Sequence, residues 1–287
     1  MTKVAIVTDS TVHIPKDHFD GLPISIIPLH ITWGNKSYRD GVDITPEEFF
    51  TRLRIDKEIP HTSQIPLQEF VAHYKNLLEQ GFEILSIHIS GRVSGTIETA
   101  RQAVLELAAH EKIALLDSRT GSAAMAFQVI EAAKAAVTGA PLAECLRIAE
   151  KIREKVHIYF IPGALDSLYR GGRIGGAAAF FGSILQVLPI LETREGMIDA
   201  VERVRTMRRA MQRVVELCEA RIKGCNKISL VGLYADIPEL ADQLLEIIRE
   251  RINSERIAQM FTTTISPAIG VHIGAGSVGL AYMYCPE

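Results

Sequence analysis

The residues best suited to chemistry lie in a short turn at positions 90–96, which holds two serines, two glycines and a threonine. The turn follows an apolar run at residues 84–89 and opens a helical pattern. The first N–H groups of a helix lack internal partners and carry the positive end of its dipole, so they attract phosphate or carboxylate. Ser94 and Thr96 add hydroxyl donors, and Gly95 lets a ligand approach the backbone. The turn therefore predicts an anion site.

The spacing of these residues excludes the common nucleotide motifs. No Gly-Lys-Ser/Thr ending follows the turn, so it is not a P-loop. The turn also lacks the Gly-x-Gly-x-x-Gly pattern of a dinucleotide site. The anion therefore need not belong to a nucleotide.

Three further segments carry groups that could serve such a site. Thr62 and Ser63 precede a helical pattern, where short hydroxyl side chains either cap the helix or bind a ligand. In residues 168–174, Arg170 and a second arginine bracket a glycine pair, which fits a solvated loop or a binding turn. His272 lies among small residues near the C-terminus, and the glycines around it indicate a close approach to the backbone.

The same residues also allow a second hypothesis, that the protein is a hydrolase or an enzyme acting on phosphate esters. It would use Ser94 as nucleophile and His272 as base, with Asp9 or Asp117 as the orienting acid. The Gly-x-Ser-x-Gly elbow is not met, because glycine is missing at both required places around Ser94. The aspartates form no recognised metal-ligand motif, so we expect no metal site.

The elements that must position these groups form an α/β pattern. Strand-like runs at residues 4–7, 84–89 and 113–116 alternate with helical patterns at residues 67–80 and 96–110, which predicts a parallel sheet. Each strand ends in polar residues. Ligands of open α/β sheets bind outside the carboxyl ends of the strands, so we expect these polar clusters to converge on one crevice.

A second lobe follows the helical pattern at residues 142–155. Apolar runs at residues 157–161, 184–191, 227–233 and 279–284 are separated by helical patterns at 207–222 and 238–252. The charged turn at residues 192–196 is typical of a hairpin. We expect an N-terminal α/β domain at residues 1–155, a C-terminal mixed α/β domain at residues 156–287, and a ligand at their interface.

Composition narrows the class of protein. With 287 residues, 47% hydrophobic and 23% charged, the chain suits a globular protein with a substantial core. The formal net charge of −3 gives no general attraction to nucleic acid or membranes; a basic cluster at residues 203–213 indicates a solvated helix face or an acidic-partner site. The four cysteines show no spacing typical of a metal or redox site, and the sequence shows no signal peptide and no membrane span. These features predict a cytoplasmic protein with at most transient membrane contact.

Six short motifs follow one another along nearly the whole chain. They are residues 8–10 (Thr-Asp-Ser), 62–64 (Thr-Ser-Gln), 93–96 (Val-Ser-Gly-Thr), 117–118 (Asp-Ser), 170–174 (Arg-Gly-Gly-Arg-Ile) and 269–276 (Ile-Gly-Val-His-Ile-Gly-Ala-Gly). Each motif is weak alone, but together they make the chain resemble the DegV family. The resemblance implies a non-catalytic, two-lobed protein without a cofactor. It would bind a long-chain fatty acid and present it to a partner kinase subunit that binds ATP, for acyl-phosphate formation in phospholipid metabolism.

The resemblance also implies roles for individual residues. Thr62, Ser94, the N–H of Gly95 and His272 resemble the groups that hold the fatty-acid carboxylate. Arg170 resembles an arginine that braces the head group or contacts the kinase. Ser63 and Thr96 adjoin these positions and are further candidates for either contact.

The acyl tail would supply most of the affinity. Each buried CH₂ contributes about 0.8 kcal/mol, so a long tail gains on the order of 10 kcal/mol before ordering costs, more than a few head-group hydrogen bonds. We expect the tunnel for this tail in the apolar residues of 157–165 and 177–191, including Phe180, Phe181 and Leu188. Each of these residues fits plain core equally well.

Overall fold

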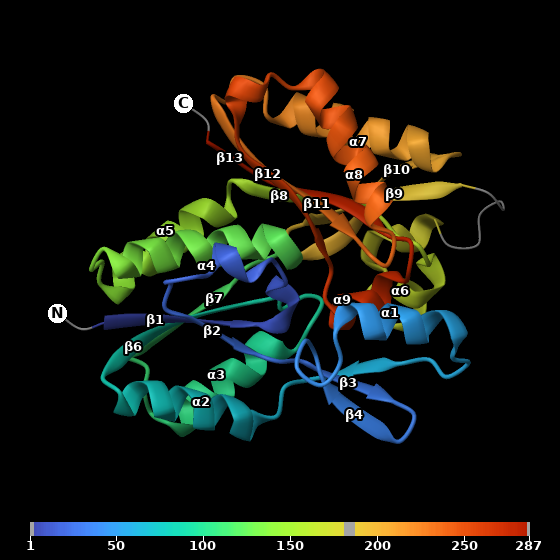
Figure 1. The fold of residues 1–287 in the computed structure, drawn as a ribbon. Coiled ribbons are helices and arrows are strands. Elements are labelled where there is room, and N and C mark those ends of the chain that lie inside the picture. The colour runs from blue at the N-terminus through green and yellow to red at the C-terminus, as the bar shows by residue number, and fades with distance from the viewer. Residues whose placement is uncertain (1–2, 181–186, 286–287) are drawn as a thin grey trace.

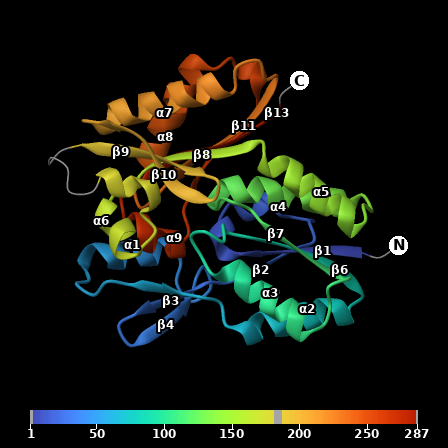
Figure 2. The same cartoon turned by 180° about the vertical axis from the view of Figure 1, so that it is seen from behind.

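The protein is built of helices and sheets stacked in layers, seen in a computed structural model that describes residues 3–180 and 187–285. A four-stranded sheet from the first half of the chain and a six-stranded sheet from the second half lie on either side of two helices (Figure 1). The view from behind shows the same order, with further helices on the outer face of each sheet (Figure 2). The expected α/β fold with a parallel sheet and a mixed sheet is confirmed.

The four-stranded sheet is parallel throughout, and it places the strand ends that the sequence singles out at one edge. Across the sheet the strands are β2 (Ile24–Ile27), β1 (Lys3–Asp9), β6 (Phe82–His88) and β7 (Ile113–Asp117). Helices α2 (Leu67–Glu79) and α3 (Thr96–Glu106) cover one face, and α4 (Ser122–Val137) and α5 (Leu142–Arg153) cover the other. Because both faces are covered, β1 is buried at every position after Lys3.

The six-stranded sheet is mostly antiparallel. Across it the strands are β10 (Met197–Val204), β9 (Leu188–Arg194), β8 (Val156–Ile161), β13 (Val278–Cys285), β11 (Lys227–Tyr234) and β12 (Ile257–Thr264). Helices α7 (Met207–Arg221) and α8 (Pro238–Arg251) pack on its outer face. The predicted hairpin is confirmed, since β9 and β10 are antiparallel neighbours joined at Glu195 and Gly196.

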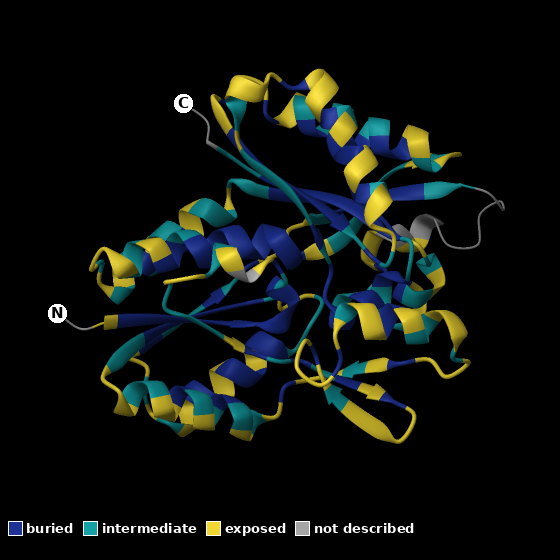
Figure 3. Cartoon of the chain, in the orientation of Figure 1, coloured by how far each residue is buried: buried dark blue, intermediate teal, exposed yellow. Residues whose placement is uncertain are grey.

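Helix α4 joins the two halves because it packs against both sheets. It is rich in alanine, and eleven of its sixteen residues are buried, on all sides of the helix (Figure 3). Small side chains let the backbones of both sheets approach the helix closely. One hydrophobic core therefore runs from the four-stranded sheet through α4 to Ile158, Phe160 and Leu233 of the other lobe. A second core lies under α7 and α8.

A smaller assembly closes one end of the molecule. Its three-stranded antiparallel sheet contains β4 (Lys36–Arg39), β3 (His30–Trp33) and β5 (His61–Ser63). Helices α1 (Pro46–Ile55) and α9 (Pro267–Ile273) pack together there, and α6 (Leu165–Arg170) packs on α9. Short 3₁₀ turns complete the described elements at Ser10–Val12, Lys16–His18, Gly175–Phe180 and Ser254–Arg256. Segments far apart in the sequence thus meet at this end.

The observed elements agree with the periodic parts of the sequence and differ at their ends. Helix α3 stops at Glu106 instead of residue 110, because Ala108 adopts a left-handed backbone with φ 47°. Of the strand expected at residues 184–191, residues 184–186 lie outside the described residues; β9 begins at Leu188 and continues to Arg194. β8 begins at Val156, while the division into domains at residues 155 and 156 stays a prediction. Among the described residues, none of the helices is both long and apolar enough to cross a membrane.

A buried carboxyl group fastens the small assembly to the parallel sheet. Ser10, just after β1, donates a hydrogen bond of 2.6 Å to Asp40 and accepts one of 3.0 Å from the N–H of Leu29. Asp40 also faces Ser266 and Ala268 at the start of α9. Burial raises the pKa of Asp40 to about 7, against the lowering effect of the hydrogen bond from Ser10.

This raised pKa predicts a pH-dependent stability. A carboxyl group with a higher pKa in the folded state stabilises the fold at low pH, and the stabilisation is lost as pH rises through about 7. Between about pH 4 and pH 8 the loss attributable to Asp40 is on the order of 4 kcal/mol. Denaturant unfolding across this range should show that Asp40→Asn flattens the decline. Asp43→Asn is the control, because Arg39 holds the pKa of Asp43 at about 2; an equal decline in all three proteins would contradict the assignment.

Candidate functional site

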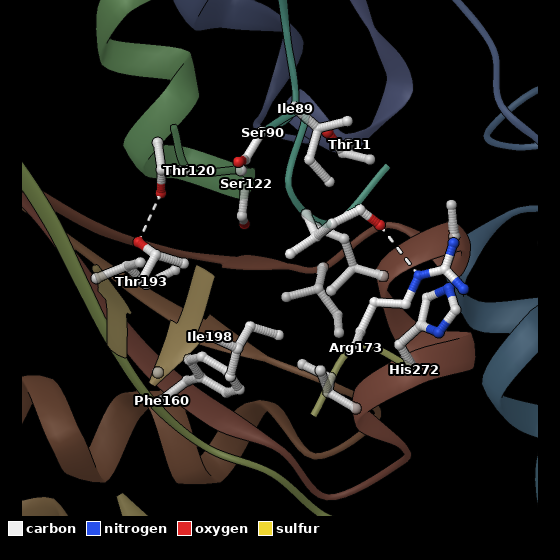
Figure 4. Close-up of a pocket in the computed structure, with 18 of the residues that line it drawn as sticks. Thr11, Ile89, Ser90, Thr120, Ser122, Phe160, Arg173, Thr193, Ile198 and His272 are labelled. Carbon is white, nitrogen blue, oxygen red and sulfur yellow. Dashed lines mark hydrogen bonds between the residues drawn. The ribbon is translucent and has the colours of Figure 1, made fainter. Parts of the chain in front are cut away.

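A cavity of about 130 Å³ lies between the two lobes (Figure 4). Its wall is mostly apolar, with Ile89 from the first lobe and Phe160, Ile198, Leu233 and Ile265 from the second. Polar side chains also contribute to this wall, among them Thr62, Ser94, Arg173 and His272. The arrangement suits a ligand that is largely apolar and carries a small polar group.

The polar strand ends of the parallel sheet converge on this cavity. Thr11 follows β1, Ser90 and Ser94 follow β6, and Thr120 follows β7; all four residues line the cavity. The predicted convergence at the carboxyl edge of the sheet is therefore confirmed.

Thr62 and His272 meet at the small assembly, although 210 positions separate them. Thr62 Oγ1 and His272 Nε2 are 2.9 Å apart and hydrogen-bonded, and both residues line the cavity. β5 alternates its side chains, so Thr62 points inward while His61 and Ser63 are exposed. The prediction that Thr62 or Ser63 caps the following helix is wrong, because Pro66 occupies the N-cap position of α2 and makes no side-chain hydrogen bond there. Ser63 does not line the cavity.

His272 is held as a neutral imidazole. Burial lowers its pKa to about 4, and the positive charge of Arg173 acts in the same direction. The ring lies against the backbone of Gly171, where a Cβ atom would be only 2.6 Å from Nδ1. Nδ1 itself has no hydrogen-bond partner among the described residues.

The close approach expected at the glycines that flank His272 comes from the protein itself. A Cβ atom at Gly270 would lie 2.8 Å from the rings of Phe49 and Phe50, and one at Gly274 would lie 2.6 Å from Ala164.

Ser94 is positioned by the start of α3. Its Oγ lies 2.9 Å from Thr96 Oγ1 and accepts a hydrogen bond of 3.3 Å from the Thr96 N–H. Thr96 is buried beneath it and does not line the cavity. Gly95 is also absent from the lining, and a Cβ there would lie 2.1 Å from the Gln64 amide. The glycine thus makes room for Gln64, while Ser94 faces the cavity.

The arginine turn presents a different residue from the one expected. Arg170 is exposed, does not line the cavity, and is 3.5 Å from Ser167 Oγ. Arg173 lines the cavity instead, beside His272 (Figure 4). It donates from Nε to Val93 O at 3.0 Å and from Nη1 to Gly171 O. The sequence shows both arginines, but only the fold reveals which one turns inward.

The components of a hydrolase triad are not assembled. No hydrogen bond joins Ser94 to His272 among the described residues. Asp9 is hydrogen-bonded to His88 and to the N–H of Ile89. Asp117 accepts hydrogen bonds from the N–H groups of Gly91 and Arg119. Within the described ranges, no group of acidic, histidine or cysteine side chains is arranged to hold a metal ion.

The predicted tunnel residues have different locations. Ile158 and Phe160 of β8 line the cavity. Leu188 packs against the second core, on the far side of the six-stranded sheet. Phe181 lies outside the described residues, as does the side chain of Phe180.

Two arginines of the basic cluster at residues 203–213 form ion pairs on α7. Arg209 and Arg213 both contact Glu216, and Arg213 also contacts Glu202 at 2.7 Å. These contacts favour the solvated helix face over an acidic-partner site. The cysteines described with their side chains, Cys145, Cys218 and Cys225, are buried and unpaired.

Comparison with known proteins adds relatives that span nearly the full chain. Residues 3–284 match the family model described as "Uncharacterised protein, DegV family". A DegV domain-containing protein from Clostridium perfringens is 36% identical over 282 residues, covering 97% of this chain and 98% of the relative.

Two solved structures share the fold. One is described as showing the fatty-acid binding of a DegV family protein from Thermus thermophilus, with a TM-score of 0.91, 29% identity, and 99% and 100% of the two chains covered. The other is DegV, a fatty acid binding protein from Bacillus subtilis, with a TM-score of 0.89, 28% identity and the same coverage.

The contact between Gly171 and His272 predicts a coupled effect on stability. Gly171→Ala places a methyl group against the imidazole and should lower the free energy of unfolding by about 1–3 kcal/mol. In a His272→Ala background the crowding is removed, so the same substitution should cost markedly less. Denaturant unfolding of the four proteins of this double-mutant cycle measures the difference. Equal costs in both backgrounds would show that Gly171 does not position His272.

Proposed function

The chain belongs to the DegV family, and from this premise we propose that it binds a long-chain fatty acid. The carboxylate lies by Thr62, Ser94 and Arg173, and the acyl tail extends along the apolar wall of the cavity. The similar structures from Thermus thermophilus and Bacillus subtilis, both described as binding fatty acids, support this proposal.

The guanidinium of Arg173 is the observation that carries the proposal. It is half-buried at the cavity wall, and among the described residues no carboxylate forms an ion pair with it. A charge withdrawn from water without a counter-ion is costly, so the site favours a ligand that brings a negative charge. A fatty-acid carboxylate supplies that charge, while the apolar remainder of the cavity matches its tail.

The hydroxyl groups complete the polar end. The Nε2–H form of His272 donates to Thr62 and avoids burying an N–H without an acceptor at Nδ1. Thr62 then keeps its own proton for the ligand. Ser94 and Thr96 share one hydrogen bond, so Ser94 has a free proton when Thr96 donates. Two hydroxyl donors and one cation therefore meet the carboxylate, and His272 acts through Thr62.

The head group and the tail have different roles in this proposal. Hydrogen bonds to a charged group contribute roughly 1.5–3 kcal/mol each and fix the orientation of the ligand. Burial of about 0.8 kcal/mol per CH₂ gives the tail the larger share of affinity. Chain preference should therefore depend on the length and shape of the apolar cavity.

We also propose that the bound acid is presented to a separate, ATP-binding kinase subunit in the cytoplasm, which forms the acyl phosphate for phospholipid metabolism. The family resemblance supports this step. Arg170 is exposed on α6, in the turn that also carries Arg173, and so is available for partner contact. Catalysis would then reside in the kinase, in keeping with the unassembled triad.

Native mass spectrometry tests the binding proposal directly. The purified protein should carry a co-purifying species with the mass of a long-chain fatty acid, and the delipidated protein should take up an added one at about equimolar ratio. An empty protein that gains no fatty-acid mass and instead hydrolyses acyl or phosphate esters would contradict it.

Ser94→Ala removes one of the proposed carboxylate donors. The dissociation constant for a fatty acid should rise roughly tenfold or more. The melting temperature of the empty protein should fall modestly, because the buried Thr96 loses Ser94 as a hydrogen-bond partner. Ser63→Ala is the matched control, since Ser63 is exposed beside Thr62 and outside the cavity. Calorimetric titration measures both variants. Unchanged affinity in Ser94→Ala would remove Ser94 from the site.

A further inference from the structure

A second group of hydroxyl side chains lines the cavity away from Arg173 and His272. It consists of Ser90 and Thr120 after the strands β6 and β7, Ser122 at the start of α4, and Thr193 from β9. Figure 4 shows these side chains around one part of the cavity and the Arg173–His272 pair at another. An unsubstituted acyl tail offers hydrogen bonds to none of them.

Three of these four hydroxyl groups have protein partners. Ser90 Oγ donates to Gly196 O at 2.7 Å, which ties the β9–β10 turn to the first lobe. Thr120 Oγ1 and Thr193 Oγ1 are 3.1 Å apart and share a hydrogen bond between the lobes. These contacts explain the three groups as structural.

Ser122 is the exception. The residue lines the cavity and is only 4% exposed, and its Oγ is buried without a hydrogen-bond partner among the described residues. A buried hydroxyl left unsatisfied costs about 1–3 kcal/mol. The residue also adopts a left-handed backbone with φ 53°, where glycine is the relaxed choice. The backbone angle of this position therefore disfavours any side chain, and its burial disfavours an unpaired hydroxyl, yet the residue is a serine.

We propose that Ser122 hydrogen-bonds a hydroxyl substituent on the acyl chain, so that the cavity accepts hydroxylated long-chain fatty acids. This inference rests on the proposed fatty-acid site and assigns its substrate class more narrowly. The substituent satisfies Ser122 Oγ at a buried part of the wall, where a hydrogen bond is strong and an unpaired polar group is costly. The Thr120–Thr193 pair adds one free proton nearby, because two hydroxyl groups that share one hydrogen bond use only one proton.

Competition binding with the delipidated full-length protein tests the assignment. The probes are stearic acid and a series of monohydroxystearic acids that differ in the position of the hydroxyl. At least one isomer should bind the wild type as tightly as stearic acid or more tightly. Ser122→Gly removes the hydroxyl and suits the backbone, and it should weaken that isomer about tenfold relative to stearic acid. Ser122→Ala serves as a second variant in case glycine loosens the start of α4.

The outcomes separate this inference from the proposed function. A position-dependent preference that disappears in Ser122→Gly and Ser122→Ala supports it. Equal preferences in all three proteins, with stearic acid still bound, overturn the role of Ser122 and leave the fatty-acid site in place. If the wild type binds neither stearic acid nor any hydroxylated isomer, the proposed function and this inference both fail.

Discussion

The hydrogen bond between Thr62 and His272 is the contact on which the site depends. It joins a strand of the small sheet to a short helix near the C-terminus, and it can form only when the chain brings β5 and α9 together. Gly171 provides the space for the imidazole, and burial keeps that imidazole neutral. A neutral histidine that donates to Thr62 leaves the threonine hydroxyl free to face the cavity. The polarity of this end of the cavity therefore follows from one tertiary contact.

Arg173 gives that end its charge. Among the described residues, the guanidinium of Arg173 is hydrogen-bonded to the carbonyl groups of Val93 and Gly171 and has no competing carboxylate, so it produces a local positive field at a half-buried wall. The chain as a whole has a net charge of −3, so attraction to an anion must come from this local arrangement. The apolar wall contributes affinity without specificity for the head group. A carboxylate with a long tail satisfies both parts at once.

Periodicity in the sequence was sufficient to predict the strands β1, β6 and β7 of the parallel sheet, the helices α2, α3 and α5, and the convergence of the polar strand ends. It did not predict β2 or α4. It could not predict β5, because a three-residue strand has too few positions to show alternation, and Thr62 fitted a helix cap and a ligand contact equally well. The choice between Arg170 and Arg173 depends on how α6 ends, which spacing alone does not specify. The burial of α4 on all sides could not be predicted either. Its alanine-rich sequence lacks a polar face, and the reason is that the second sheet covers the side that would otherwise face solvent. The sequence does not single out Ser122, because its proposed role follows from its left-handed backbone and from the absence of a hydrogen-bond partner for its Oγ among the described residues.

The orientation of the bound ligand tests the account most directly. A crystal structure of the protein with a long-chain fatty acid should place a carboxylate oxygen within hydrogen-bonding distance of both Thr62 Oγ1 and Ser94 Oγ, with the tail directed away from Arg173. A carboxylate bound at the other end of the cavity, near Thr120 and Thr193, with the tail against His272, would contradict it.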